Sequence, residues 1–143
     1  MDIAELKRRF PDEESCINEF KIIKEKLGII CPKCGNIEHS WRACDLKHQC
    51  NKCGFRQSLR SGTLLQNSKL PFRYWIIAVH LIANSYKNIS AREMQIRLNH
   101  KRYEPIWLMM KKINSIIEKE DYKKSPIELL MKCLSEVKHK RHL

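Results

Sequence analysis

The chain has 143 residues, of which 43% are hydrophobic and 31% charged, a composition typical of a folded globular protein and not of a disordered chain. Its 28 Lys and Arg side chains outnumber its 16 Asp and Glu side chains, and the resulting net charge of +12 favours a polyanionic partner, above all nucleic acid. No apolar run approaches the ~20 residues of a transmembrane helix, so we expect no membrane partner.

The first predicted element is an amphipathic helix over residues 12–27, and we assign residues 1–28 to this N-terminal helix. Apolar side chains recur at three- and four-residue steps between Cys16 and Leu27, and Gly28 is a natural C-terminal stop. The residues before the helix lack the apolar core of a signal peptide. We therefore expect a cytoplasmic protein, associated with the bacterial nucleoid, whose cysteines are reduced.

Residues 29–60 are predicted to form a small β ribbon, with weakly alternating segments at 40–43 and 48–51. Two C-x-x-C pairs stand in this region, in C-P-K-C-G and C-N-K-C-G, and fifteen residues separate them. Two residues between cysteines let both thiolates bind one ion, and the glycine that follows permits the turn. The pattern predicts one structural Zn²⁺ with no open position for a catalytic water. The predicted ligands are Cys31, Cys34, Cys50 and Cys53.

Other residues of the ribbon and two further cysteines have alternative interpretations. His39 and Cys44 lie between the two pairs and are alternative ligands, but the pairs already satisfy the metal, so we expect ordinary ribbon residues. Trp41 could stack on a base or pack against the ribbon, and packing is favoured. Cys16 and Cys133 fall on apolar helix faces and are interpreted as small buried residues.

Residues 61–70 are assigned to a linker, and residues 71–118 to three helices. Pro71, which is tolerated at the first helical position, opens a helix whose broad apolar face predicts that it is mostly buried. Trp75 on this helix and Trp107 on the third helix are both expected in the core.

The second of these helices is short and begins after Ser90. Ser90 and Glu93 match the capping box S-x-x-E, in which each side chain bonds the other's backbone N–H. A short turn over residues 99–101 separates it from the third helix, which begins near residues 102–105. Three helices with a short turn between the second and the third are the layout that places the third helix in the major groove of DNA.

The basic surplus is concentrated in the ribbon and the three helices. Seven basic and two acidic residues give residues 29–70 a net charge of +5, and nine and three give residues 71–119 a net charge of +6. We expect the residues that open the third helix to contact base edges, and other cations to contact phosphates. The predicted DNA contacts are Arg92, Lys101, Arg102, Tyr103, Glu104, Lys111 and Lys112.

Residues 119–143 are predicted to form a charged connection and a basic C-terminal helix that Pro126 opens. Asp121 and Glu128 are too few and wrongly spaced for a two-metal carboxylate site. We therefore expect a protein that is not an enzyme and has no small-molecule substrate.

The order of these motifs resembles the N-terminal region of a family of bacterial insertion-sequence transposases, the ISXO-type transposases. The resemblance covers residues 30–117 and rests on C-P-K-C-G, H-Q-C-N-K-C-G-F-R-Q-S-L-R-S-G-T, S-K-L-P-F-R-Y-W and I-S-A-R-E-M-Q-I-R-L-N-H-K-R-Y-E-P-I-W-L-M-M-K-K-I. It implies a zinc ribbon and a helix-turn-helix that recognise terminal inverted repeats, ahead of a DDE-type nuclease. The matching positions are Cys31, Cys34, Cys50, Cys53, Gln57, Ser58, Gly62, Thr63, Leu70, Pro71 and Trp75.

Two features depart from that family. Asn99 stands where the family usually has glycine, although asparagine tolerates the left-handed conformation that the turn needs. The nuclease would begin near residue 125 with a strand that carries a catalytic Asp, whereas this sequence continues from Ser125 into the basic helix. We interpret the chain as derived from, or a truncated form of, such a transposase.

The sequence thus predicts a mostly α-helical protein with a small β zinc ribbon. The leading hypothesis is zinc-dependent, sequence-specific binding of double-stranded DNA without catalysis. Two alternatives remain open at this point. One is a protein-interaction module that forms a homodimer, or pairs with an intact transposase and inhibits it. The other is an RNA-binding zinc-ribbon protein.

Overall fold

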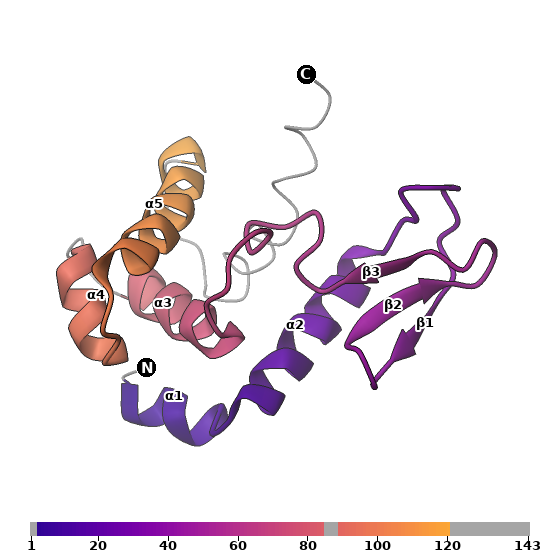
Figure 1. Cartoon of the computed structure of the whole chain (residues 1–143). Coiled ribbons are helices and arrows are strands. Elements are labelled where there is room, and N and C mark those ends of the chain that lie inside the picture. Colours follow the sequence, from indigo (N-terminus) through magenta and orange to yellow (C-terminus); the bar gives the residue numbers. More distant parts are fainter. Residues whose placement is uncertain (1–2, 85–88, 121–143) are drawn as a thin grey trace.

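The computed structural model describes residues 3–84 and 89–120, and within them it confirms a mostly helical chain with one small sheet (Figure 1). The sheet lies at one end of the molecule, α4 and α5 lie at the other, and α2 and α3 lie between them. The predicted C-terminal helix after residue 125 and Cys133 fall outside the described residues. The elements are α1 (Ile3–Arg9), α2 (Glu13–Leu27), β1 (His39–Arg42), β2 (Lys47–Cys50), β3 (Arg56–Ser58), α3 (Phe72–Asn84), α4 (Ala91–Leu98) and α5 (Tyr103–Glu120).

The N-terminal region contains two helices where the sequence predicted one. The predicted helix is α2, which begins after the N-cap Asp12 and ends at Gly28, a residue with φ of 90°. The Asp12 side chain accepts a hydrogen bond from the Ser15 N–H at 2.8 Å, and the Ser15 hydroxyl accepts one from the Asp12 N–H at 3.5 Å, which completes a capping box. The helix α1 has only seven residues, and burial of Leu6 holds it against the core. Such a short amphipathic segment carries too little periodicity to predict.

The three strands form an antiparallel sheet in the order β1-β2-β3, and β3 is a strand that the sequence analysis missed. Trp41 lies opposite His48, which lies opposite Gln57, so these three side chains share one face of the sheet. The rings of Trp41 and His48 are 4.8 Å apart, and the His48 Nε2 atom is 3.0 Å from a carboxylate oxygen of Glu25 on α2. Trp41 therefore packs between the sheet and α2, as the sequence analysis favoured.

The segment over residues 61–70 is packed against the core, which corrects its assignment as a linker. Leu64, Leu65 and Leu70 are buried in the same cluster as the helices. Arg60 donates to the carbonyl oxygens of Ser68 at 2.8 Å and Leu70 at 2.6 Å, so the backbone of the segment is held as well. Its polar composition suggested a solvent-exposed connection, but its three leucines are covered by elements far away in the sequence.

The helix α3 is the centre of the core, as its broad apolar face predicted. Trp75, Ile76 and Val79 are almost completely buried. The carboxylate of Glu13, on α2, accepts hydrogen bonds from the backbone N–H groups of Phe72 at 2.7 Å and of the next residue at 3.1 Å. The start of α3 is therefore capped by a side chain from another helix.

The helices α4 and α5 pack against each other, joined by residues 99–102. Ser90 accepts a hydrogen bond from the Glu93 N–H at 3.0 Å, but the Glu93 carboxylate lies 3.6 Å from Arg97, so only half of the predicted capping box forms. Asn99 ends α4 in the left-handed conformation, with φ of 53°, as expected for the residue that replaces glycine.

The buried face of α5 consists of Ile106, Met109, Met110, Ile113 and Ile116. Trp107 is 42% exposed, so the expectation that it lies in the core is wrong. It stands one helical step, about 100°, from Ile106 and therefore falls on the flank of the helix, outside the arc that faces α3 and α4.

Candidate metal centre and nucleic-acid interface

The four predicted zinc ligands come together at the end of the sheet. The Sγ atoms of Cys31, Cys34, Cys50 and Cys53 all lie within 4.8 Å of one another, and the pairs Cys31–Cys53 and Cys34–Cys50 are each 3.5 Å apart. A disulfide requires about 2.05 Å, so these are four thiol groups. Four thiolates bound to one tetrahedral Zn²⁺ at about 2.3 Å would be about 3.8 Å apart. The cluster could therefore hold a metal ion with only a small adjustment.

The two C-x-x-C pairs repeat one backbone conformation. The N–H groups of Cys31 and Cys50 each donate to the carbonyl five residues later, at 2.9 and 2.8 Å. The N–H groups of Gly35 and Gly54 donate back to those same two cysteines, at 2.9 and 3.1 Å. Both glycines have a positive φ, 79° and 81°, which a residue with a Cβ adopts only with strain. The glycine after each pair is thus part of the site's geometry.

Backbone groups also prepare a sulfur for metal binding. The N–H groups of Cys53 and Lys52 point at the Cys50 Sγ atom, at 3.5 and 3.4 Å, and lower the pKa of the Cys50 thiol to about 5. The Asn36 amide contributes a further contact at 3.6 Å. The thiolate is the form that binds metals, and a donor set of four thiolates is one that Zn²⁺ accepts.

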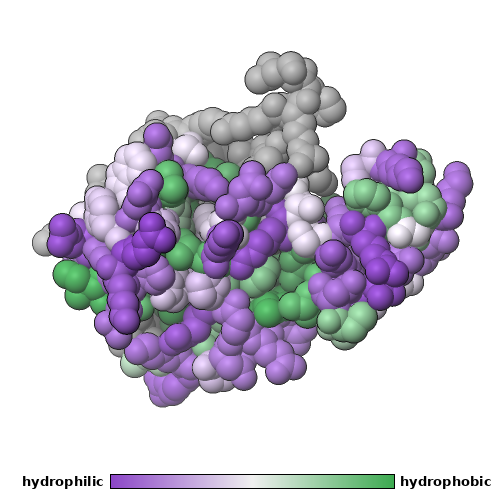
Figure 2. Space-filling view, viewed as in Figure 1, coloured by the Kyte–Doolittle hydropathy of each residue, from purple (hydrophilic) through white to green (hydrophobic). Residues whose placement is uncertain are grey.

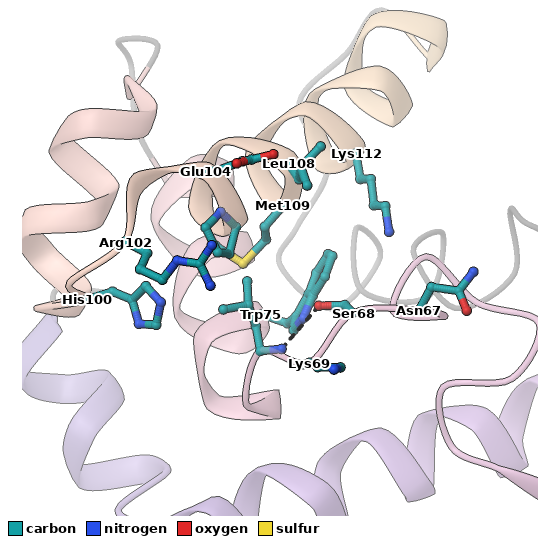
Figure 3. Close-up of a pocket in the computed structure, with 12 residues that line it drawn as sticks. Asn67, Ser68, Lys69, Trp75, His100, Arg102, Glu104, Leu108, Met109 and Lys112 are labelled. Carbon is teal, nitrogen blue, oxygen red and sulfur yellow. Dashed lines mark hydrogen bonds between the residues drawn. The ribbon is translucent and has the colours of Figure 1, made fainter.

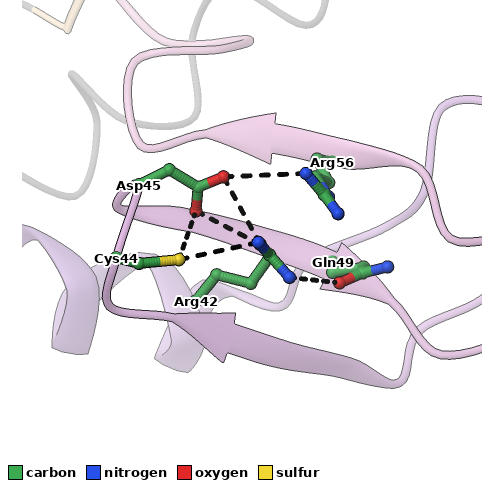
Figure 4. Close-up of polar contacts among 5 residues, drawn as sticks. All are labelled: Arg42, Cys44, Asp45, Gln49 and Arg56. Atoms are coloured by element: carbon green, nitrogen blue, oxygen red, sulfur yellow. Dashed lines mark hydrogen bonds and ion pairs between the residues drawn. The ribbon is translucent and has the colours of Figure 1, made fainter.

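His39 and Cys44 do not join the cluster that the described residues form. The Cys44 Sγ atom lies 3.5 Å from Arg42, in the turn between β1 and β2 (Figure 4). Arg42 also bonds Asp45 at 3.3 Å and Gln49 at 3.2 Å, which organises the polar face of the sheet. The four cysteines alone remain as the candidate metal ligands in this part of the chain.

Lys24 connects the ribbon to α2 and was missed by the sequence analysis. Its ammonium group donates to three backbone carbonyls, of Ser58 at 2.9 Å, Leu59 at 3.2 Å and Ser61 at 3.1 Å, and the residue is only 7% exposed. Its partners lie 34 to 37 residues away in the sequence. That long-range packing distinguishes it from the other lysines of the same helix, the half-buried Lys21 and the exposed Lys26.

The predicted DNA contacts differ in their surroundings. Six of the seven are exposed: Arg92, Lys101, Arg102, Tyr103, Glu104 and Lys111. The seventh, Lys112, donates to the carbonyl oxygens of Leu64 at 3.2 Å and Gln66 at 3.5 Å, and burial lowers the pKa of its ammonium group. Lys112 thus holds the 61–70 segment against α5 instead of pointing freely into solvent.

Two of these residues, Tyr103 and Lys111, lie on one flank of α5, and Arg92 of α4 lies beside them. The Arg92 guanidinium is 5.5 Å from the centre of the Tyr103 ring, and the Lys111 ammonium is 5.0 Å from that of Trp107. All but Arg92 line a hollow of about 500 Å³ that also includes Ser90 at the start of α4. Trp107, which the sequence analysis placed in the core, belongs to this surface; its regular spacing from Tyr103 and Lys111 was the signal available.

Three predicted contacts border a second hollow, of about 470 Å³, on the other side of α5. Arg102 and Glu104 line it together with Lys112, and Trp75 lies between Arg102 and Lys112 (Figure 3). Residues 67–70 complete its wall. Six of the seven predicted contacts are therefore divided between two surfaces, and Lys101 lines neither hollow.

Residues of the sequence motifs outside the cysteine pairs make contacts inside the fold. The Thr63 hydroxyl donates to the Arg60 carbonyl at 2.8 Å and accepts from the Leu65 N–H at 3.1 Å. Gly62 has a φ of 71°, and Trp75 is 1% exposed. These positions support the path of the chain between the sheet and α3.

Comparison of the chain with known protein families, curated proteins and solved structures gives no match. None of the helices within residues 3–84 and 89–120 is long and apolar enough to cross a bilayer.

Proposed function

We propose that this chain is a zinc-dependent, sequence-specific binder of double-stranded DNA. In this proposal the four cysteines hold one structural Zn²⁺ in a ribbon, and α4, the turn at residues 99–102 and α5 form a helix-turn-helix. The observation that carries it is the exposed junction of the turn and α5, where Lys101 and Arg102 of the turn and Tyr103, the first residue of α5, are all exposed. A third helix with this presentation is suited to the major groove.

The metal's role in the proposal is structural. Zinc, when bound, would tie the two cysteine pairs together by four bonds that leave no open position. The ribbon is connected to the helices through α2. Lys24 and Glu25 of α2 bind the ribbon, and Glu13 at the other end of α2 caps α3. The ribbon thus supports the helices that carry the cationic surface.

The motifs shared with ISXO-type transposases support a more specific target, the terminal inverted repeats of an insertion sequence. The proposal concerns recognition alone and assigns no catalytic step to the described residues. A cationic surface also suits RNA, but a helix fits the major groove of B-form DNA and not the deep, narrow groove of an RNA duplex.

Site selection from random duplexes with the zinc-loaded protein tests this function. We expect enrichment of a motif at least as long as one half-site, and binding that weakens steeply as salt rises. Duplex DNA with the selected motif should displace a labelled probe at least tenfold better than scrambled DNA or duplex RNA at matched salt. Selection without an enriched motif, or equal competition by RNA, would contradict the proposal.

A further inference from the structure

We infer that one flank of α5 recognises thymine in duplex DNA through contact of aromatic side chains with the thymine 5-methyl group. This inference rests on the proposed function and names the base that the surface would select. The aromatic flank, as we call it, consists of Tyr103, Trp107, Lys111 and Asn114 of α5, with Arg92 of α4 beside them.

The two aromatic rings of this flank are unusually exposed. Tyr103 is 43% and Trp107 42% exposed, whereas Trp75 of the same chain is 1% exposed. They stand four residues apart and therefore lie one above the other on the helix. Hydrophobic residues reach the face of the molecule drawn in Figure 2 only in small separate patches, so that face is not built for broad apolar contact.

Cations accompany both rings. Arg92 lies over the Tyr103 ring at 5.5 Å and Lys111 over the Trp107 ring at 5.0 Å. Covering this flank with an apolar protein surface would desolvate both charges without compensation. A polyanion compensates them, and the chain's net charge of +12 has the same complementarity.

The start of α4 adds to the attraction for phosphate. Ser90 and Ala91 line the same hollow as the aromatic flank, and they begin a helix of eight residues. The first N–H groups of a helix have no partner within it, and its N-terminus carries a partial positive charge. A DNA strand whose bases face the rings could therefore place a backbone phosphate near Ser90.

The spacing along α5 suits a groove. Tyr103, Trp107, Lys111 and Asn114 occupy successive turns and extend over about 16 Å along α5 at 1.5 Å per residue, and a helix about 10–12 Å in diameter fits a major groove about 12 Å wide. Thymine is the base that presents a methyl group there, and apolar side chains contact it. Asn114 is exposed, and an asparagine amide matches the paired adenine. The flank therefore favours A·T base pairs.

Replacement of single thymines by uracil in the selected duplex tests the inference, because uracil keeps every base-pairing group and lacks only the methyl. For the zinc-loaded wild-type protein we expect at least one position where the replacement weakens binding about fourfold, the equivalent of one apolar methyl contact. The Trp107→Ala variant should bind more weakly and show no loss at that position. Leu108→Ala is the matched control, since Leu108 is 45% exposed on a different side of α5 and should retain the uracil effect.

Three outcomes would overturn the inference. One is a wild-type protein that binds its selected duplex with no uracil-sensitive position. A second is an equal uracil effect in wild type and Trp107→Ala. The third is a wild-type dimer in sedimentation that Trp107→Ala dissociates, which would make the flank a contact between copies. Absence of any duplex binding would instead refute the proposed function. Thermal unfolding of both variants confirms that they remain folded.

Discussion

Several long charged side chains of this protein bind main-chain groups of segments elsewhere in the chain. Lys24, Arg60 and Lys112 donate to backbone carbonyls, and Glu13 accepts from backbone N–H groups. Such contacts satisfy polar groups that regular secondary structure does not reach. Each of them therefore fixes a piece of irregular chain at the expense of one ordered side chain.

Replacement of Lys24 by methionine tests this role at the scale of one residue. The variant leaves three carbonyls without their ammonium partner, and we expect the free energy of unfolding of the zinc-loaded protein to fall by about 2 kcal/mol. Urea unfolding followed by circular dichroism measures it. Lys26→Met is the control, because Lys26 is exposed on the same helix and its replacement should change stability by less than about 0.5 kcal/mol. Equal effects of the two replacements would contradict the assigned role.

At the scale of elements, the ribbon has three short strands and few buried apolar side chains of its own. Its most buried positions, each 2% exposed, are Cys31, Cys50, His48 and Leu59, and two of these are candidate metal ligands. A unit of this size needs a metal or similar cross-link to remain folded. Structural zinc sites contribute on the order of 10–16 kcal/mol of apparent binding free energy, which would be folding free energy here.

Cys34 and Cys44 are both exposed, but only Cys34 belongs to the cysteine cluster, so serine variants of the two test the ligand assignment. Cys34→Ser should weaken metal binding by more than a hundredfold, because it removes one of four ligands, and it should reduce the β-sheet signal in circular dichroism. Cys44→Ser should leave both unchanged, since Cys44 lies outside the cluster. Competition with a chelator of known affinity gives the binding constant. A Cys44→Ser variant that loses metal to the same extent would overturn the ligand assignment.

Local patterns predicted the elements better than they predicted the contacts between elements. The C-x-x-C-G spacing predicted which four cysteines form a cluster, and the apolar periodicity predicted the positions of the helices α2, α3, α4 and α5. Both signals are local, because each lies within a few residues of the chain. The packed 61–70 segment depends on partners dozens of residues away, which no local pattern encodes. The prediction that Trp107 lies in the core is wrong for a different reason. One helical step separates the core from the flank of α5, and the sequence does not give the angle at which the helix packs.

At the scale of the whole molecule, α2 connects the two ends of the structure. Its last turns contact the ribbon through Lys24 and Glu25, and its first turn caps α3 through Glu13. Because α3 also packs against α5, the candidate metal centre and the candidate DNA-binding surface are joined through one continuous core. We therefore expect metal binding to affect the stability of the helices as well as of the ribbon.

The hydrogen bonds from the start of α3 to Glu13 join α2 to α3, and a Glu13 variant tests their contribution to stability. Glu13→Gln keeps the size of the side chain but removes the charge that accepts from the two N–H groups, and we expect a loss of about 1 kcal/mol in the free energy of unfolding. Glu14→Gln, at an exposed neighbouring position, should have almost no effect. Denaturant unfolding of both variants measures the difference. If Glu13→Gln were as stable as Glu14→Gln, the carboxylate would not be acting as a cap.

Because these cations bind backbone carbonyls, the donor and acceptor positions differ in the substitutions that they tolerate. A carbonyl oxygen is supplied by every amino acid, so the positions that accept from Lys24, Arg60 and Lys112 can exchange their side chains without losing the bond. The donors have no such freedom, because only a long cationic side chain reaches those oxygens. Among diverged copies of this chain, the three cations should therefore persist more often than Ser61, Gln66 and Ser68, whose side chains bond residues two to four positions away.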